Sequence, residues 1–105
     1  MLTVGTPADN PAADAVLVTS GVVTAPRRTR VRITVASEIN VWVAVIHRNT
    51  GGGALSTILI PVGGLLLGPI DLYETYFGEG DYVEVRVREG IPAVVGTVQA
   101  SVELV

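Results

Sequence analysis

Cysteine is absent from the 105-residue chain, which excludes disulfides, thiolate metal sites and thiol nucleophiles together. Lysine is also absent, so all seven cations are arginines, set against ten carboxylates at a formal net charge of −3. Histidine occurs once, which rules out a pair of histidine metal ligands. Nucleic-acid binding needs a basic face, and acidic residues outnumber basic ones here. The composition therefore favours neither redox chemistry, a zinc site nor a nucleic-acid partner.

Targeting signals are also missing. The N-terminus MLTVGTPADNPAADA lacks the basic and apolar regions of a secretory signal, so we expect a protein made in the cytoplasm and used without export. The most apolar window, residues 54–70, is broken by prolines and glycines and is shorter than the roughly 20 residues of a spanning helix. No membrane partner is expected.

What the chain does have is β-branched residues: 19 valines, 7 isoleucines and 10 threonines. Such side chains are stiff and fit a pleated sheet better than a helix. Short apolar or alternating runs separated by turn signals predict strands, while residues 49–53 are a predicted loop and residues 73–80 a predicted turn or single helical turn. The expected strands cover residues 15–25, 29–37, 39–48, 54–62, 65–72, 81–89 and 97–105. This pattern predicts an all-β antiparallel β-sandwich of the jelly-roll type, with residues 15–105 as a single domain.

Residues 1–14 differ from the rest, because they are rich in proline and aspartate and poor in apolar residues after Val4. We expect an extended N-terminal arm here. A neighbouring subunit is the obvious place for such an arm to bind, through its apolar residues Leu2 and Val4.

Arginines alternate with apolar residues in the run RRTRVR, so Arg28, Arg30 and Arg32 are predicted to share one side of a strand. The simplest interpretation is a solvated strand face. Alternatives are pairing with the carboxylates of a protein partner, for which arginine is well suited, and a phosphate-binding stripe.

Leucine occurs three times in succession at Leu65, Leu66 and Leu67, and neighbours on a strand point to opposite faces. At least one of these leucines is therefore expected to face outward, against a partner. The aromatic cluster of Tyr73, Tyr76 and Phe77 is interpreted as an interface anchor. Trp42 is expected in the core. A carbohydrate-binding platform of stacked aromatic rings is the alternative.

No catalytic or metal-binding motif is present, so we predict a protein that is not an enzyme and has no cofactor. A catalytic triad would need one of four serines beside His47, and none has the sequence context of a nucleophile. His47 with Asp71 or Glu74 is the remaining enzymatic or metal-binding alternative. Carboxylates clustered between Asp71 and Asp81 match no calcium-loop spacing.

Three phrases carry a family resemblance: VTAPRRTRVRITVAS (23–37), GEGDYVEVRV (78–87) and GTVQASVELV (96–105). Together with the polar N-terminal segment, they resemble the small head-decoration (cement) proteins of tailed bacteriophages. The resemblance implies a virion protein on the outer capsid surface. It would form homo-trimers, bind the major capsid protein or another virion protein, and stabilise the capsid lattice. A carbohydrate-binding sandwich or a spike or tail component is the alternative.

Overall fold

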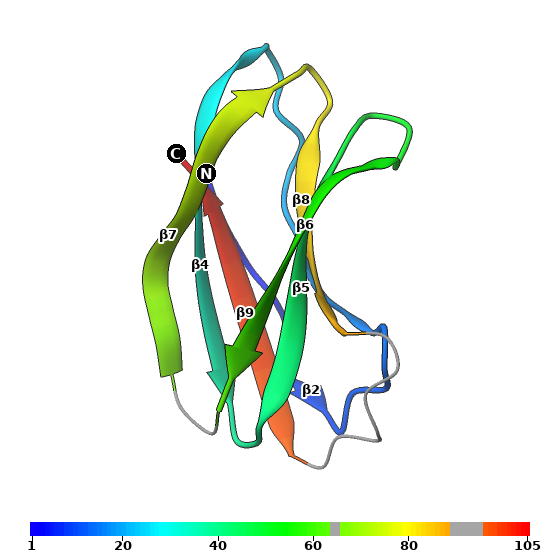
Figure 1. Cartoon of the computed structure of the whole chain (residues 1–105), viewed down its shortest axis with the longest axis vertical. Helices are drawn as coiled ribbons and strands as arrows, with labels where there is room; N and C mark the ends of the chain where they lie inside the picture. The colour runs from blue at the N-terminus through cyan, green and yellow to red at the C-terminus, as the bar shows by residue number, and fades with distance from the viewer. Residues whose placement is uncertain (64–65, 89–95) are drawn as a thin grey trace.

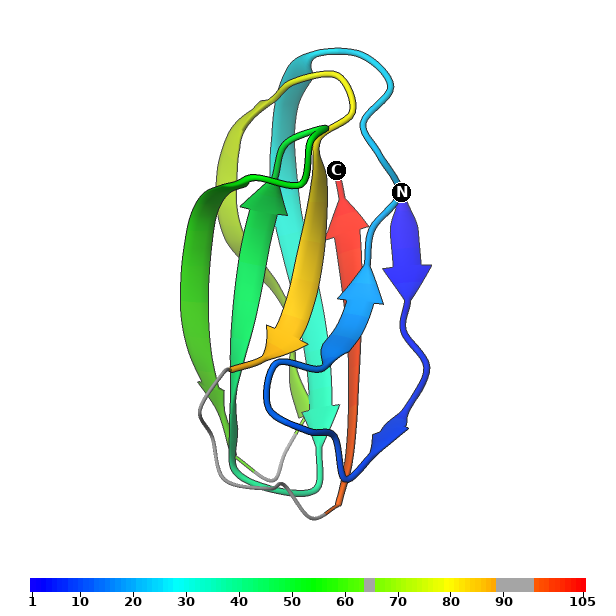
Figure 2. The same ribbon diagram turned by 90° about the vertical axis from the view of Figure 1, so that its right-hand side faces the viewer.

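The computed structural model describes residues 1–63, 66–88 and 96–105, and all regular structure in these residues is β. Two antiparallel sheets pack face to face, so the predicted all-β sandwich is confirmed (Figures 1 and 2). Nothing in these three ranges forms a helix that could cross a membrane. The strands are β1 (Leu2–Val4), β2 (Ala8–Asp9), β3 (Val16–Thr19), β4 (Arg27–Ser37), β5 (Val41–Arg48), β6 (Ala54–Val62), β7 (Leu66–Phe77), β8 (Tyr82–Val87) and β9 (Thr97–Leu104).

The strands pair in a nested order, in which each antiparallel pair encloses the next in the sequence. Sheet A has the order β1-β9-β4-β7, with β2 also on β9, and sheet B has the order β3-β8-β5-β6. The pairs β5–β6, β4–β7, β3–β8 and β2–β9 enclose one another, and all are antiparallel. As a result, β6 and β7 are the edge strands at one flank of the sandwich, and β1 and β3 lie at the other (Figure 2).

The core lies between the sheets and is built from the alternation that the sequence predicts. Val31, Ile33 and Val35 of β4 are buried, whereas Arg28, Arg30 and Arg32 point to the other side. Burial of each such aliphatic side chain contributes about 1.5–3 kcal/mol. The same alternation holds in β8 and β9, whose inward residues are Val83, Val85, Val87, Val98, Ala100, Val102 and Leu104.

The N-terminal segment lies along β9 of its own chain. Thr3 is opposite Val102 and Ala8 is opposite Val98, so β1 and β2 form an edge of sheet A. Gly5 bridges the two strands by donating its backbone N–H to the carbonyl of Ala100 at 2.9 Å. Binding of this segment to a neighbouring subunit stays a prediction.

Three local predictions are wrong. Residues 73–77 continue β7 instead of turning, because they pair with β4 as far as the Phe77–Arg27 register. Trp42 is 43% exposed on the outer face of sheet B, where the guanidinium of Arg88 lies 5.9 Å from its ring centroid. Residues 15–25 were predicted to form one or two strands around Gly21, and they form only the short strand Val16–Thr19. β5 is apolar along both faces because its outward residues Ala44 and Ile46 are also buried. β5 lies between β6 and β8, whose side chains cover them.

Candidate functional site

Most of the residues predicted to bind a partner lie on the outer face of sheet A. This surface is called the ladder face, after a row of ion pairs between arginines and carboxylates that crosses it. Residues directly opposite each other in an antiparallel pair point to the same side of the sheet. Arg28 is opposite Tyr76 and Ala36 is opposite Leu66, while Leu2 is opposite Glu103 at the other edge. Seven predicted residues therefore share this face: Leu2, Val4, Arg28, Arg30, Arg32, Leu66 and Tyr76.

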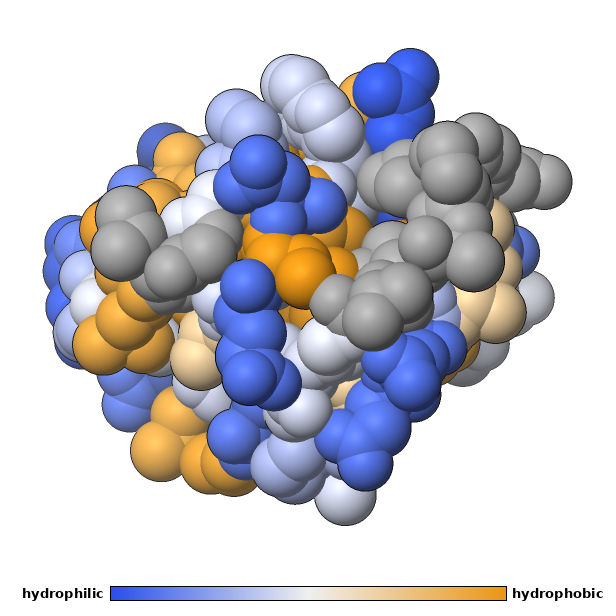
Figure 3. Space-filling view, turned by 90° about the horizontal axis from the view of Figure 1, so that it is seen from below, coloured by the Kyte–Doolittle hydropathy of each residue, from blue (hydrophilic) through white to orange (hydrophobic). Residues whose placement is uncertain are grey.

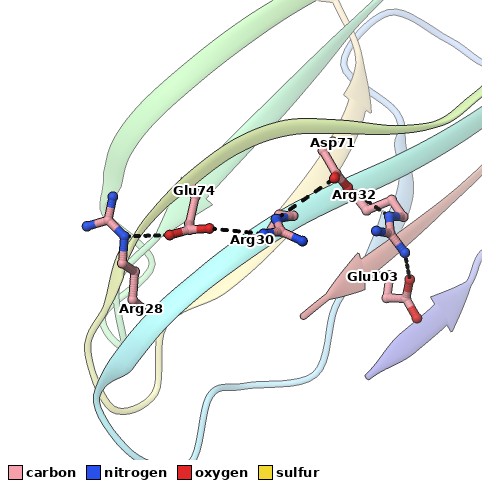
Figure 4. Close-up of polar contacts among 6 residues, drawn as sticks. All are labelled: Arg28, Arg30, Arg32, Asp71, Glu74 and Glu103. Carbon is pink, nitrogen blue, oxygen red and sulfur yellow. Dashed lines mark hydrogen bonds and ion pairs between the residues drawn. The ribbon is translucent and has the colours of Figure 1, made fainter.

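The three arginines form a continuous ion-pair ladder with three carboxylates of the same chain (Figure 4). Glu74 accepts from Arg28 Nε at 2.6 Å and from Arg30 Nη2 at 3.4 Å. Asp71 accepts from Arg32 Nε at 2.8 Å and lies 3.8 Å from Arg30 Nε. At the far end, Arg32 Nη1 donates to Glu103 at 3.1 Å.

The ladder favours the ionised forms of Asp71 and Glu74. The hydrogen bond from Arg32 lowers the pKa of Asp71, and the hydrogen bond from Arg28 lowers the pKa of Glu74. Asp71 in turn raises the pKa of Arg32. Because three cations meet three anions, the ladder has no net charge, and its pairs are too exposed to contribute much to folding stability.

Donor groups remain available at the outer end of the ladder. The Arg28 side chain is 68% exposed, and within the described ranges only its Nε makes a hydrogen bond. Arginine has five N–H donors, so the rest of this guanidinium can bind a carboxylate of a partner.

Apolar side chains flank the ladder. Leu66 is 67% exposed, Tyr76 and Val4 are each 62% exposed, and Leu2 is 61% exposed. At the lower end of sheet A, an open hollow of about 520 Å³ lies beside Leu66, Ala36 and Gln99. Seen from this end, apolar side chains show between polar ones at the surface (Figure 3). The ladder face thus combines paired charges with exposed apolar groups, which is typical of protein-contact surfaces.

The remaining predicted partner residues are placed differently. Phe77 is fully buried, so its predicted partner contact is wrong: it is the last inward residue of β7 and packs in the core. Leu67 and Tyr73 also turn inward and are half-buried against the core. Burial raises the pKa of the Tyr73 hydroxyl, and the nearby Ser56 partly offsets this. Leu65 lies outside the described residues. Of the two described leucines in the run, Leu66 faces outward and Leu67 inward, and at least one outward leucine was expected.

His47 pairs with a different carboxylate from those predicted. Its Nε2 lies 3.0 Å from Asp81 Oδ2, and its ring stacks on Phe77 with centroids 3.9 Å apart. Asp81 also accepts the backbone N–H of Gly78, so this buried pair ties β5 to the turn before β8. Asp71 and Glu74 belong to the ladder instead. Across the described residues, no group of three potential metal ligands comes together.

Glu103 is the ladder residue that the sequence interpretation missed. It alternates with the buried Val102 and Leu104, so its outward direction could be predicted. Its pairing with Arg32 depends on β9 lying next to β4, which no local pattern reveals.

Comparison with known proteins identifies no relative: no protein-family model matches the chain, and neither do curated proteins or solved structures.

Proposed function

We propose that this protein is a non-enzymatic structural component of a virus particle, which docks through its ladder face on a capsid lattice and stabilises it. The observation that carries the proposal is the gathering of exposed apolar side chains around the ion-pair ladder on one face. The resemblance to bacteriophage head-decoration proteins carries the choice of a capsid as the partner. In this proposal the protein resides on the outer capsid surface.

A lattice suits a surface of this kind. Each small interface is weak, but many copies bound to neighbouring lattice sites hold the assembled shell together. The nested strand pairs support the jelly-roll interpretation, which fits the proposed family. The homo-trimer that the resemblance implies stays a prediction, and docking of the ladder face does not require it.

Two other functions are less well supported. A carbohydrate platform needs exposed aromatic rings side by side, whereas Trp42 and Tyr76 lie on opposite outer faces of the sandwich. A phosphate-binding stripe needs an excess of positive charge, whereas three carboxylates of the same chain balance the three ladder arginines. A place in the tail or spike would use the same face on a different protein partner.

Co-sedimentation with empty capsids tests the proposal, using capsids assembled from the major capsid protein encoded in the same genome. Wild-type protein should bind saturably, and Leu66→Asp and Tyr76→Asp should each weaken binding at least about tenfold, because they place a charge in an apolar contact. Val16→Asp is the matched control, since Val16 is 49% exposed on β3 of sheet B. Equal loss of binding in all three variants, or no binding by the wild type, would contradict docking through the ladder face.

A further inference from the structure

The two sheets formed by the described residues have four edges, and three of them are protected against pairing with another strand. The β1–β2 edge consists of strands of three and two residues, separated by a segment with Gly5 and Pro7. β3 has four residues and a register shift. β7 is longer, but it carries Pro69, two register shifts and the charged residues Asp71 and Glu74. Short strands, prolines, bulges and charges are the usual means of blocking an edge.

The β6 edge lacks this protection in its central part. Among the described residues, β6 pairs only with β5, so the backbone groups along its other side have no strand partner in those ranges. An irregularity at Leu55 and the proline at 61 delimit five regular residues, Ser56–Ile60, with neither charge nor glycine. Thr57 and Leu59 are exposed on the outer side of this run, and Ile58 and Ile60 are half-buried on the inner side. β6 lies at the left flank in Figure 2.

An open hollow with a mixed lining adjoins this edge. It has a volume of about 470 Å³ and opens between β6 and β7, where Leu55, Ile58 and Tyr73 lie beside the polar Ser56, Glu74 and Thr75. A strand added beside β6 would send its inward side chains toward this hollow, because cross-strand neighbours point to the same side. The edge therefore offers backbone hydrogen bonds together with an open hollow for side chains, where Leu55 and Ile58 supply apolar contact.

We propose that β6 pairs with β6 of a second copy of this chain, joining the two B sheets into one eight-stranded antiparallel sheet. Pairing of a strand with itself is related by a two-fold axis. Full overlap of residues 56–60 occurs in one such register, the one centred on Ile58. This register places Ile58 against Ile58 of the second copy, where both face the hollow, and places each Thr57 opposite a Leu59.

A second copy suits the edge better than a charged partner does. The run is uncharged, so two copies meet without like-charge repulsion and leave no ionic group unpaired. Two-fold pairing also closes at two copies, since it uses both β6 edges. The inference does not rest on the proposed capsid docking, although Glu74 and Tyr76 of the ladder face also line the hollow. It predicts a two-fold dimer in place of the homo-trimer that the family resemblance implies.

Charge substitutions at positions 57 and 59 test both the surface and the register. In the acidic variant Thr57→Glu/Leu59→Glu, each new carboxylate lies opposite another, and the basic variant Thr57→Lys/Leu59→Lys does the same with ammonium groups. The mass in solution is measured by light scattering on size-exclusion chromatography, from micromolar to millimolar concentrations. Wild-type protein should reach twice its 10.9 kDa chain mass, and each variant should dimerise at least about tenfold more weakly. An equimolar mixture should restore the dimer, because carboxylates then face ammonium groups.

The control is Val16→Glu/Thr19→Glu, which adds the same charge to exposed positions on β3, the other edge of sheet B; it should dimerise like the wild type. A second measurement uses only the wild type: amide hydrogen exchange in residues 56–60 should slow as the concentration rises. Four results would each overturn the inference: a wild-type monomer at millimolar concentration, a trimer, a mixture that remains monomeric, or loss of the dimer in the control.

Discussion

Phe77 and Tyr76 are adjacent aromatics with opposite environments, and truncating each to alanine should separate the core from the proposed docking surface. Phe77 is fully buried, and its ring stacks on His47 at a centroid distance of 3.9 Å and an interplanar angle of 12°. Phe77→Ala removes that contact and leaves a cavity, for which a loss of about 3–5 kcal/mol is expected. Tyr76 is 62% exposed, so Tyr76→Ala should change stability by no more than about 0.5 kcal/mol.

Urea unfolding followed by circular dichroism measures both effects, and thermal unfolding gives an independent scale. A loss of 3 kcal/mol corresponds to a decrease in Tm of about 12 °C or more for a domain of this size. A loss below about 1 kcal/mol for Phe77→Ala would refute the placement of this ring in the core. A loss for Tyr76→Ala equal to that for Phe77→Ala would refute its placement on the ladder face.

Three further predictions concern backbone packing, the buried histidine pair and pH. Gly5→Ala should destabilise the protein by about 1–3 kcal/mol in urea unfolding, because the new Cβ would overlap the backbone carbonyl oxygens of Leu17 and Ala100. Thr6→Ala, at the exposed neighbouring position, is the control and should leave stability unchanged. Asp81→Ala should cost about 1–3 kcal/mol, since His47 and the Gly78 N–H lose a buried acceptor, and an unchanged urea midpoint would contradict this. Because the folded-state pKa values of Asp71 and Glu74 are lowered, their stabilisation is present above the ordinary carboxyl pKa of about 4 and is lost as the pH falls through the folded values. Asp71→Asn/Glu74→Gln should flatten the acid limb of stability against pH slightly, because these exposed pairs contribute little, and a steeper acid limb in the double variant would count against the ladder.

The strand pattern was largely predictable, because burial on one face imposes a two-residue period on the sequence. This period identified the inward and outward residues of β4, β8 and β9, and a short apolar run between turn signals gave the extent of β6. It failed at residues 73–77, where glutamate and threonine in YETYF resemble a turn. Tertiary pairing with β4 overrides that local signal.

The composition of the ladder face was only partly predictable. Alternation placed the three arginines on one side, but the partners Asp71, Glu74 and Glu103 come from strands whose neighbours are set by long-range topology. Phe77 was misassigned because a cluster of aromatics does not reveal which ring points inward. Trp42 was misassigned because its apolar neighbours Ala44 and Ile46 suggested that both faces of β5 are buried. Those two outward residues are buried, but Trp42, near the start of the strand, is exposed.

The orientation of the protein on a capsid tests the central claim most directly. Cryo-electron microscopy of empty capsids incubated with the protein would show which side of the sandwich meets the shell. Docking through the ladder face predicts that sheet A, with Leu66, Tyr76 and Arg28, lies against the capsid surface and sheet B faces away. Bound protein with sheet B against the shell, or capsids without added density at saturating protein, would contradict the account.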